Sequence, residues 1–350
     1  MKSFSKTLTD WYQINKRDLP WRHTRNPYPI WLSEVILQQT RVDQGMAYYR
    51  RFLELFPDIK ALANASEDEV LKAWQGLGYY SRARNLHATS KIISELHGGS
   101  FPGSSAELLK LKGIGPYTAA AIASFAWNER VPVIDGNVMR VAARIFGLDI
   151  PVDTPAGRQQ IEEILQKHID PAEPGIFNQA IMEFGALQCV PANPECLSCV
   201  FNKACKAFNN DLVASLPIKS QKTKVKNLWL SFFHITWKNK VYIHRRTEKG
   251  IWQGLYDFPS VESQKKPVSS KVVDAFFPEN LPGLNPTVES ISKEYIHLLS
   301  HRKIHAVFYL VKLQKQWKNL PSHVMEINAE DLHQYGIPRL IDRYLNDMDN

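Results

Sequence analysis

The spacing of hydrophobic residues changes once along the chain, and this change predicts two different folds. From residue 1 to about residue 210, apolar residues recur at helical spacing in segments such as "LFPDIKALANASEDEVLKAW" and "FPGSSAELLKLKGIGPYTAAAIASFAW". Ser66 with Glu69, and Ser104 with Glu107, have the spacing of helix capping boxes before apolar runs. We therefore expect an all-helical domain over residues 1–210.

A lysine-rich stretch follows, and after it the apolar residues alternate with a period of two. Residues 211–227 end in "LPIKSQKTKVKN", which lacks apolar periodicity and is typical of an exposed basic linker. The segments "LWLSFFHITW" and "VYIHRR", joined through Asn239-Lys240, predict a β-hairpin. "EYIHLLSHRKIHAVFYLVKL" predicts two more strands around a polar turn from Ser300 to Lys303, and "IPRLIDRYLND" predicts a final helix. We expect residues 228–350 to form an α+β domain.

Glu34 is the only charged residue in "PIWLSEVILQQT", a predicted helical segment. Trp31 belongs to an apolar stripe on one side of Glu34, and Leu37 lies on its other side. The positions three and four residues away offer no partner for a salt bridge. Two interpretations are open at this point: a solvated glutamate at the edge or first turn of a helix, or a carboxyl group kept in apolar surroundings for chemistry.

The composition adds bounds on size, charge and compartment. A length of 350 residues favours two domains over one, and 44% hydrophobic with 22% charged residues is ordinary for a globular protein. The net charge of +8 favours a polyanionic partner, although charge alone is weak evidence for nucleic acid. The chain has no recognisable signal peptide and no run of about 18 apolar residues, so we expect a soluble, cytoplasmic protein without membrane contact.

The four cysteines lie within 17 residues, in a loop that is rich in proline and asparagine. Six, two and five residues separate successive cysteines, which indicates a metal or cluster site and excludes a disulfide framework spread over the fold. Zinc sites usually contain two close CxxC pairs and this loop contains one, so the spacing favours an iron–sulfur cluster but leaves zinc open. The four residues are Cys189, Cys196, Cys199 and Cys205.

The segment "LKGIGPYTAAAIA" predicts two helices joined by a tight turn. The turn contains Gly113-Ile114-Gly115, and Pro116 suits the first position of the second helix. Backbone N–H groups at such a helix N-terminus can bind a phosphate, although a purely structural helix hairpin has the same signature. Asp135, in "VPVIDGNVMRV", has a similar ambiguity, because it can simply cap the helix that starts near Asn137.

The combined motifs resemble a known family. The GIG hairpin with a downstream aspartate is similar to that of the helix-hairpin-helix DNA glycosylases, and the cysteine loop resembles the cluster loop of their endonuclease III-like branch. Within that branch, "LPWR" at 19–22, "WLSEVILQQTRV", "GLGYYSRARNLH", "IDGNVMRV" and "FNQAIMEFGALQC" resemble the MutY-type adenine DNA glycosylases, and the resemblance covers the whole chain. It implies one 4Fe-4S cluster per chain, held by the four cysteines. It also implies a bacterial-type, nucleoid-associated monomer that acts on double-stranded DNA containing adenine opposite 8-oxoguanine or guanine.

Two comparisons inside the family carry further implications. Bifunctional endonuclease III-like members have a lysine just after the hairpin, and Tyr117 stands there, so the resemblance implies a monofunctional glycosylase that uses water. The segment "GIWQGLYDFPS" resembles a Nudix fold, but the glutamate cluster that binds metal in Nudix hydrolases does not follow it, which implies a reading domain. The Phe-Ser-His turn that recognises 8-oxoguanine in the family stands here as Leu299-Ser300-His301. The expected fold is therefore multidomain, an all-helical helix-hairpin-helix glycosylase domain with an iron–sulfur loop followed by a Nudix-like α+β domain.

The resemblance also assigns roles to individual residues. It makes Glu34 the general acid that protonates adenine N7, Asp135 the carboxylate that stabilises the cationic sugar, and Tyr117 their neighbour. It implies that Arg22 and Glu183 contact the flipped adenine. The other expected substrate contacts are Trp21, Leu37, Gln39, Thr40, Leu77, Gly78, Tyr79, Ser300 and His301, and the expected DNA-backbone contacts are Gly113 and Gly115.

Two other functional classes are kept as alternatives. An endonuclease III-like enzyme that removes oxidised pyrimidines and cleaves the strand is one, and Tyr117 together with the C-terminal domain argues against it. The other is an inert iron–sulfur protein that only senses DNA, which the presence of both Glu34 and Asp135 argues against.

Overall fold

The computed structural model describes residues 3–220 and 225–348, which pack into two compact units. One unit comprises Met1–Asn64 and Ala88–Gln221, and the other comprises Ala65–His87 and Lys222–Asn350. The division into domains at 1–210, 211–227 and 228–350 stays a prediction, since by packing residues 65–87 group with the C-terminal part of the chain. Lys222 and Lys224 of the predicted linker lie outside the described residues.

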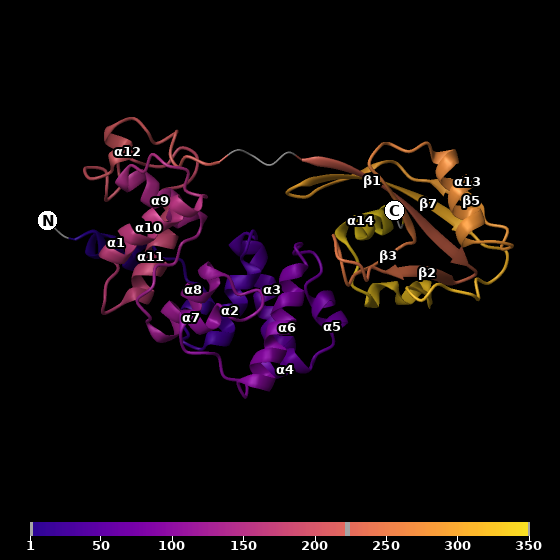
Figure 1. Cartoon of the computed structure of the whole chain (residues 1–350), viewed down its shortest axis with the longest axis horizontal. Coiled ribbons are helices and arrows are strands. Elements are labelled where there is room, and N and C mark those ends of the chain that lie inside the picture. Colours follow the sequence, from indigo (N-terminus) through magenta and orange to yellow (C-terminus); the bar gives the residue numbers. More distant parts are fainter. Residues whose placement is uncertain (1–2, 221–224, 349–350) are drawn as a thin grey trace. The chain divides into compact units, whose positions relative to one another are not determined.

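The first unit consists of helices and loops, as predicted, and its described residues form no β-strand. The colours of Figure 1 follow these helices from indigo through magenta. They are α1 (Phe4–Asn15), the 3-10 helix η1 (Pro20–Arg22), α2 (Pro27–Ile36), α3 (Val42–Leu55), α4 (Ile59–Asn64), the later turns of α6 (Ser81–Leu96), α7 (Ser105–Leu108), α8 (Pro116–Trp127), α9 (Gly136–Phe146), α10 (Pro155–His168), α11 (Pro174–Leu187) and α12 (Lys206–Asn209). Helix α5 (Glu67–Ala73) and the start of α6 belong to the second unit.

Local sequence signals start and stop these helices. The capping box at Ser66 and Glu69 is present, with both of its hydrogen bonds formed. Ser104 also caps a helix, because its hydroxyl accepts a hydrogen bond from the backbone N–H three residues on. That helix, α7, ends at Leu108 rather than extending to Leu111, since the N–H groups of Lys110 and Leu111 bond to carbonyls three residues back in the tighter 3-10 pattern.

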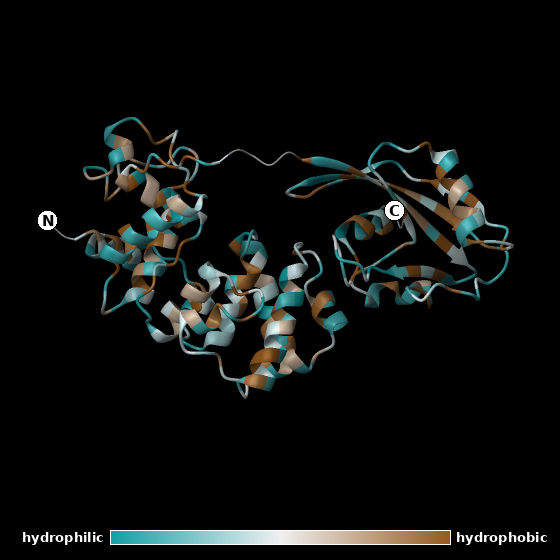
Figure 2. Cartoon of the chain, viewed as in Figure 1, coloured by the Kyte–Doolittle hydropathy of each residue, from teal (hydrophilic) through white to brown (hydrophobic). Residues whose placement is uncertain are grey.

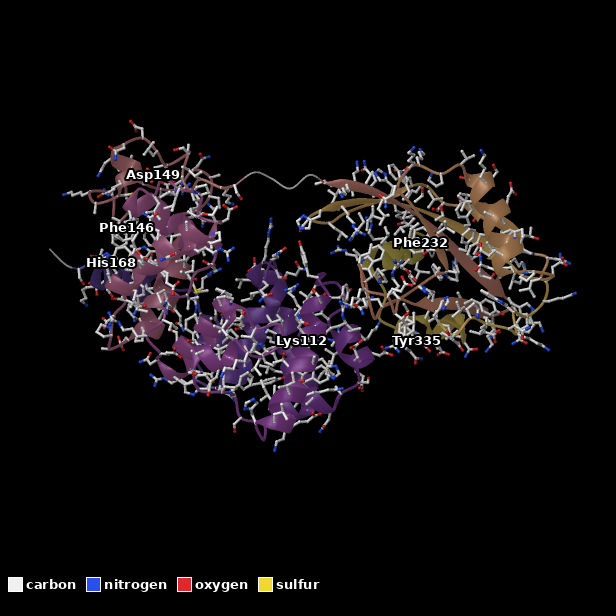
Figure 3. The ribbon with its side chains drawn as sticks, viewed as in Figure 1. Lys112, Phe146, Asp149, His168, Phe232 and Tyr335 are labelled. Atoms are coloured by element: carbon white, nitrogen blue, oxygen red, sulfur yellow. The ribbon has the colours of Figure 1, made fainter. Side chains whose placement is uncertain are left out.

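The hydrophobic core around α9 lies where α1, α9 and α11 pack together. Val141 of α9 is fully buried in the same cluster as Phe177 and Phe184 of α11. Phe146 and His168, which are labelled in Figure 3, stack with ring centroids 5.3 Å apart at the ends of α9 and α10. This packing fixes the middle and the C-terminal end of α9.

The second unit is built on a mixed β-sheet that has eight strands among the described residues. The strand order is β3-β2-β1-β7-β5, with β4 paired to β1, β6 to β7 and β8 to β2. Only the central pair of β1 and β7 is parallel among the described strand pairs, and the others are antiparallel. The strands are β1 (Lys226–Trp237), β2 (Lys240–Arg245), β3 (Tyr256–Asp257), β4 (Ser260–Ser263), β5 (Thr287–Ile291), β6 (Tyr295–Leu298), β7 (Arg302–Lys312) and β8 (Val324–Asn328).

Helices cover both faces of this sheet. Successive residues of a strand point to opposite faces, so each face of the central strands offers aromatic side chains for a helix to pack on. Phe233 of β1 stacks on Phe276 of α13 (Ser269–Asn280), with ring centroids 3.7 Å apart. On the opposite face, Phe308 of β7 stacks on Tyr344 of α14 (Arg339–Met348) at 3.9 Å, and the short helix η2 (Ala329–Gln334) precedes α14. Figure 2 shows the alternation of hydrophobic and hydrophilic residues along β1.

The two predicted hairpin connections are present, with one shift. The first turn is formed by Lys238 and Asn239, since β2 already begins at Lys240 and pairs with Trp237. Lys238 adopts a left-handed backbone conformation there, with φ of +53°. The second connection joins β6 to β7 and carries Ser300 and His301 at its tip. None of the helices within residues 3–220 and 225–348 combines the length and apolar character that crossing a bilayer requires.

Candidate active site

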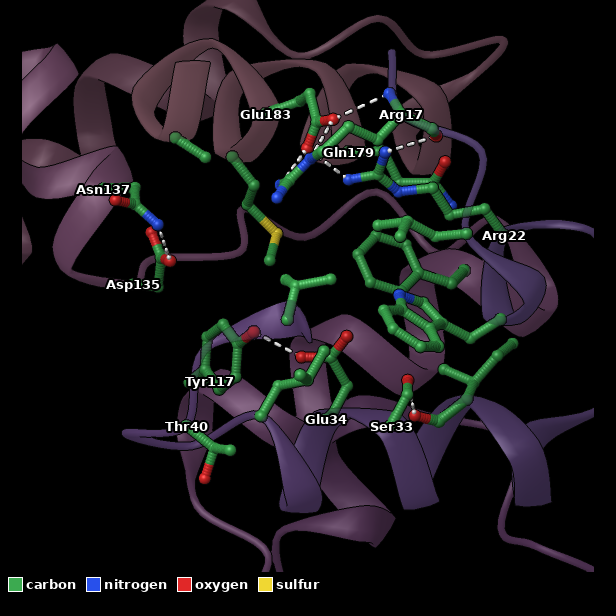
Figure 4. Close-up of a pocket in the computed structure, with 18 of the residues that line it drawn as sticks. Arg17, Arg22, Ser33, Glu34, Thr40, Tyr117, Asp135, Asn137, Gln179 and Glu183 are labelled. Atoms are coloured by element: carbon green, nitrogen blue, oxygen red, sulfur yellow. Dashed lines mark hydrogen bonds and ion pairs between the residues drawn. The ribbon is translucent and has the colours of Figure 1, made fainter. Parts of the chain in front are cut away.

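Helices α2, α8 and α11 and the residues that lead into α9 surround one pocket of the first unit (Figure 4). Its volume is about 260 Å³, far above the roughly 10–15 Å³ that one water molecule needs, so it can admit a small organic group. The predicted site residues that line it are Trp21, Arg22, Glu34, Leu37, Thr40, Tyr117, Asp135 and Glu183. Residues far apart in sequence are therefore brought together as the family resemblance implies.

Glu34 is buried on α2, with 5% of its surface exposed, which rules out a solvated edge glutamate. The Tyr117 hydroxyl donates a hydrogen bond to its Oε2. Burial raises the pKa of Glu34 from about 4.5 to about 7, although this hydrogen bond acts in the opposite direction. Leu37 lines the pocket as expected, but Trp31 packs instead against Phe101, with ring centroids 5.4 Å apart. Near neutral pH, Glu34 can hold a proton or release it.

Tyr117 reaches Glu34 because α2 and α8 lie close together. Five alanines of α8 are buried, and such small side chains allow close packing of the two helices. Gln38 Nε2 also donates a hydrogen bond of 3.3 Å to the Thr118 hydroxyl between these segments. Burial raises the pKa of Tyr117 well above its ordinary value, so the hydroxyl keeps its proton and acts as a donor.

Asp135 caps α9 and also lines the pocket, so the capping interpretation and the site interpretation both hold geometrically. Its Oδ1 accepts a hydrogen bond of 2.7 Å from the Val138 N–H, and its Oδ2 accepts one of 2.9 Å from Asn137 Nδ2. Burial raises the pKa of Asp135, while these hydrogen bonds lower it. The helix N-terminus fixes the carboxylate in one orientation and favours its charged form.

Glu183 forms the opposite wall of the pocket with two arginines (Figure 4). Arg17 donates to it from its backbone N–H, Nε and Nη2 at 2.7–2.9 Å, and Arg22 Nη2 donates at 2.7 Å. Burial alone would raise the pKa of Glu183, but the hydrogen bonds from Arg17 and Arg22 outweigh it and lower the pKa to about 2. This carboxylate is therefore charged near neutral pH, and its oxygens hold the arginines in place.

Sequence reasoning did not find three of the polar residues that shape the pocket: Arg17, Asn137 and Gln179. The Gln179 side-chain oxygen accepts a hydrogen bond of 2.8 Å from the buried Tyr12 hydroxyl. Its amide nitrogen makes no hydrogen bond among the described residues and stays available as a donor. The motif "FNQAIMEFGALQC" contained Gln179 four residues before Glu183, one helical turn away, which was the usable signal.

Other predicted substrate contacts lie outside this pocket. Gln39 is exposed just after α2, with φ of +57°. Leu77 and Gly78 belong to the second unit, where both of their carbonyls accept hydrogen bonds of 3.2 Å from buried Arg82. Tyr79, the next residue, is the third predicted substrate contact in this segment.

Tyr79 joins this segment to the β6–β7 turn within the second unit. Its side chain is 46% exposed, and its hydroxyl is hydrogen-bonded to the Ser300 hydroxyl at 2.5 Å. His301 is exposed beside Ser300 at the tip of the turn. The Leu299 N–H donates to the Arg302 carbonyl at 2.8 Å and closes the turn, so the two polar side chains are presented by a short, defined loop.

The hairpin glycines stand at the N-terminus of α8, as predicted. Gly113 has φ of +76°, a conformation that L-residues adopt rarely. Gly115 is the N-cap, and Pro116 occupies the first helical turn. Both glycines are exposed, so the backbone N–H groups at this helix end are accessible to a phosphate.

The four cysteines line one cavity together with Arg144, and none of them forms a disulfide. Among the described residues, no three histidine, cysteine or acidic side chains converge as a ready mononuclear metal site. The thiols instead line a small cavity of about 20 Å³. Their loop is tied to α9 by Arg140, whose Nε donates to the Cys189 carbonyl at 2.8 Å and whose Nη2 donates to Asn137 Oδ1 at 2.9 Å.

Comparison with known proteins agrees with this architecture. Residues 32–171 match the HhH-GPD superfamily of base excision DNA repair proteins, and residues 231–347 match the NUDIX domain. The adenine DNA glycosylase of Buchnera aphidicola subsp. Schizaphis graminum is 33% identical over 347 residues, covering 98% of this chain and 97% of that protein. The human adenine DNA glycosylase is 41% identical over 59% of this chain and 39% of its own length.

A solved structure supports the helical part of this assignment. A thermostable thymine-DNA glycosylase aligns with a TM-score of 0.55 and 27% identity, over 59% of this chain and 95% of its own. From this full-length similarity, the chain belongs to the MutY-type adenine DNA glycosylase family, with a helical HhH-GPD domain followed by a NUDIX domain.

Proposed function

We propose that this adenine DNA glycosylase removes adenine that stands opposite 8-oxoguanine or guanine in double-stranded DNA, and that it uses water rather than an amine as the nucleophile. The observation that carries the proposal is the pocket that combines buried Glu34, hydrogen-bonded to Tyr117, with the capped carboxylate of Asp135. A strand-cleaving relative needs a lysine where Tyr117 stands.

The base must leave the helical stack before it can enter the pocket, which costs a few kcal/mol and is easiest at a mismatch. Glu34 then donates its proton to N7 of adenine, which makes the base a better leaving group. A pKa of about 7 suits this role, because the group is largely protonated in mildly acidic solution, about half protonated near neutral pH, and can still give the proton away.

Breakage of the bond between the base and C1′ leaves the bonding electron pair on the departing adenine and positive charge on the sugar. Asp135 stabilises this oxocarbenium-like cation by its negative charge. A water molecule adds to C1′ and gives its proton to the Glu34 carboxylate, which has just lost its own, so that free adenine and an intact abasic strand result. The hydrogen bonds from Val138 and Asn137 hold the Asp135 carboxylate for this step and favour its ionised form.

Arg22 and Gln179 are the groups proposed to read the adenine edge. Gln179 can donate from its free amide nitrogen to a ring nitrogen, since Tyr12 fixes the amide orientation through the oxygen. Glu183 acts on the base through Arg22, which it holds at 2.7 Å. Trp21, Leu37 and Thr40 complete the walls around the base.

The second unit is proposed to recognise the opposite base. Ser300 and His301 would hydrogen-bond to 8-oxoguanine, and Tyr79 already contacts Ser300. Gln39, Leu77 and Tyr79 are proposed to contact or wedge beside the orphaned 8-oxoguanine, with Gly78 allowing the turn between Leu77 and Tyr79 through its positive φ. Gly113 and Gly115 would bind a DNA phosphate through the N-terminus of α8.

The cysteine loop is proposed to hold one 4Fe-4S cluster through its four thiolates. The donor set fits, because four cysteine side chains line one cavity and none of them forms a disulfide. When bound, the cluster would cross-link the loop and so fix the residues after α11. A monomeric state and a cytoplasmic, nucleoid-associated location also stay proposals.

One assay separates the main alternatives. Single-turnover cleavage of a duplex with adenine opposite 8-oxoguanine is followed by gel, with and without alkali, and with borohydride to trap Schiff bases. We expect adenine release, strand breaks only after alkali and little trapped adduct. Efficient breakage without alkali would indicate an endonuclease III-like lyase, and DNA binding without base release would indicate an inert sensor.

A further inference from the structure

Arg144 is a buried cation that no carboxylate neutralises among the described residues. Its side chain lies at the C-terminal end of α9, and only 3% of the residue is exposed. Three of its hydrogen bonds go to backbone carbonyls, those of Leu216 at 3.0 Å, Val190 at 2.7 Å and Pro191 at 3.0 Å. Carbonyl oxygens orient a guanidinium group but do not cancel its charge. Because an isolated buried charge is costly, the surroundings of Arg144 call for an anion.

The cysteine cavity, which Arg144 itself lines, is a place where such an anion can bind; the exposed Glu195 also lines it but makes no ion pair with Arg144 among the described residues. Arg144 Nη1 donates to Cys189 Sγ at 3.6 Å, and the Arg144 carbonyl is 3.4 Å from Cys205 Sγ. The same residue thus touches the first and the last cysteine of the motif. Four thiolates that share an iron–sulfur cluster carry net negative charge, which this guanidinium would face directly.

We propose that Arg144 is the built-in counter-cation of the cluster and sets its reduction potential. The inference rests on the proposed 4Fe-4S cofactor and goes beyond the excision reaction. An N–H donor and a positive charge beside a ligating sulfur stabilise the more negative, reduced state of the cluster. The three carbonyls hold the guanidinium rigidly, so the donor cannot turn away from the sulfur when the cluster changes oxidation state.

Full-length variants purified with their cluster test this assignment. Arg144→Met removes the charge and all the donors, and Arg144→Lys keeps the charge but not the forked geometry. Arg130→Met is the matched control, because Arg130 is exposed and its side chain donates to the Gln166 carbonyl at 3.2 Å. Iron per chain, the midpoint potential by voltammetry and the rate of iron release to a chelator are measured for each.

Arg144→Met should shift the midpoint potential to more negative values. It should also release iron roughly tenfold faster or more, because loss of an outer-shell partner of a metal ligand typically weakens metal affinity by at least that factor. Arg144→Lys should lie between wild type and Arg144→Met, and Arg130→Met should match wild type. If Arg144 only supported the fold, its substitution would lower the amount of bound cluster but would leave the midpoint potential of the remaining cluster at the wild-type value.

The outcomes separate this inference from the proposed cofactor. Wild-type protein without iron would defeat the cofactor proposal itself. Iron-loaded Arg144 variants with wild-type potential and release rate would overturn the role of Arg144 and leave the cofactor standing. If Arg144→Met does not accumulate as folded protein, Arg144→Lys decides, and a wild-type potential and release rate for that variant overturn the proposal.

Discussion

The Tyr117 hydroxyl donates its hydrogen bond to Oε2 of Glu34, and Oε1 of the same carboxyl group accepts none among the described residues. A donor at Oε2 disfavours a proton on that oxygen, so protonated Glu34 carries its hydrogen on Oε1. Glu34 lines the pocket, and the hydrogen-bonded tyrosine thus leaves the acid proton on the oxygen that is free to meet a base. One hydrogen bond sets both the orientation of the acid and the site of its proton.

Glu34→Gln should abolish base excision without weakening DNA binding. Glutamine keeps the size of the side chain but has no transferable proton, and general acid catalysis is commonly worth about 10²–10⁴-fold. Single-turnover adenine release, measured with binding at fixed salt, checks this. The wild-type rate should fall as the pH rises through about 7, because the protonated acid is then lost. Excision by Glu34→Gln within tenfold of the wild-type rate would remove Glu34 from the mechanism. Glu163→Gln serves as the control, because Glu163 is exposed on α10.

The same substitution should stabilise the fold in mildly alkaline solution. The folded-state pKa of Glu34, about 7, is higher than the value of about 4.5 expected in the unfolded chain, so the folded state binds the proton more tightly. Its contribution to stability is fully present below pH 4.5 and is lost as the pH rises through 7. Glutamine does not ionise, so Glu34→Gln should have a free energy of unfolding that is higher than that of wild type in mildly alkaline solution, by roughly 3 kcal/mol for a pKa shift of this size. Urea unfolding at pH 5 and pH 8 measures it, and equal effects of the substitution at both pH values would contradict it.

Tyr117→Phe should move the pH profile of excision upwards. The hydrogen bond from Tyr117 lowers the pKa of Glu34, so its removal lets burial raise that pKa further, and the rate should then fall at a higher pH than in wild type. The rate at the optimum should also drop, since the acid loses its fixed orientation. Tyr117→Lys should instead gain borohydride-trapped adduct. An unchanged pH midpoint for Tyr117→Phe would mean that the contact has no effect on the acid.

Two substitutions of Asp135 separate its structural role from its chemical one. Asparagine caps helices about as well as aspartate, so Asp135→Asn should keep stability but lose most activity. Asp135→Ala should lose activity and also cost about 0.5–2 kcal/mol of stability, because the N-cap is gone. Thermal unfolding and single-turnover excision of both variants check this. If Asp135→Asn excises adenine normally, Asp135 is only a helix cap.

Replacement of Ser300 and His301 by alanine should reduce the preference for 8-oxoguanine over guanine while basal adenine removal stays measurable. Loss of a hydrogen-bonding pair of this kind is typically worth about 1–3 kcal/mol. Parallel excision from the two mismatches gives the preference directly. Lys303→Ala is the control. Lys303 lies in β7 just after the turn, so this substitution removes a charge nearby but leaves Ser300 and His301 in place. A double variant that keeps the full preference would place recognition elsewhere in the second unit.

Much of the fold could be predicted because its signals are local. Helical spacing, capping residues and the change to a period of two gave the order of helices and strands, and the turn of Ser300 and His301 followed from the polar residues between two strands. The first hairpin turn was placed one residue too late, at Asn239-Lys240. Lys238 adopts a positive φ there although it is not a typical turn residue, so its sequence carries no signal of the turn.

The pocket could be predicted only in part, since its polar contacts are long-range. Neighbours of Glu34 on its own helix showed that it lacks a local partner, but the hydrogen bond to Tyr117 depends on how α2 meets α8. Arg17 and Glu183 are 166 positions apart, and no periodicity relates them. The resemblance to the family predicted that Glu183 belongs to the site. It did not show what Glu183 does there, which is to hold Arg17 and Arg22 through its two carboxylate oxygens.

Helix α9 carries Asp135 at its first end and Arg140 and Arg144 further along, on the side of the cysteine loop. It has 11 residues and so spans about 16 Å. Insertion or deletion of one residue between these groups would rotate the later ones by about 100° relative to Asp135. Either the arginines would leave the cysteine loop or the carboxylate would leave the pocket. Single-residue changes in the length of α9 should therefore be far more damaging than side-chain substitutions on its surface, and related sequences that differ elsewhere by insertions should keep this segment at constant length.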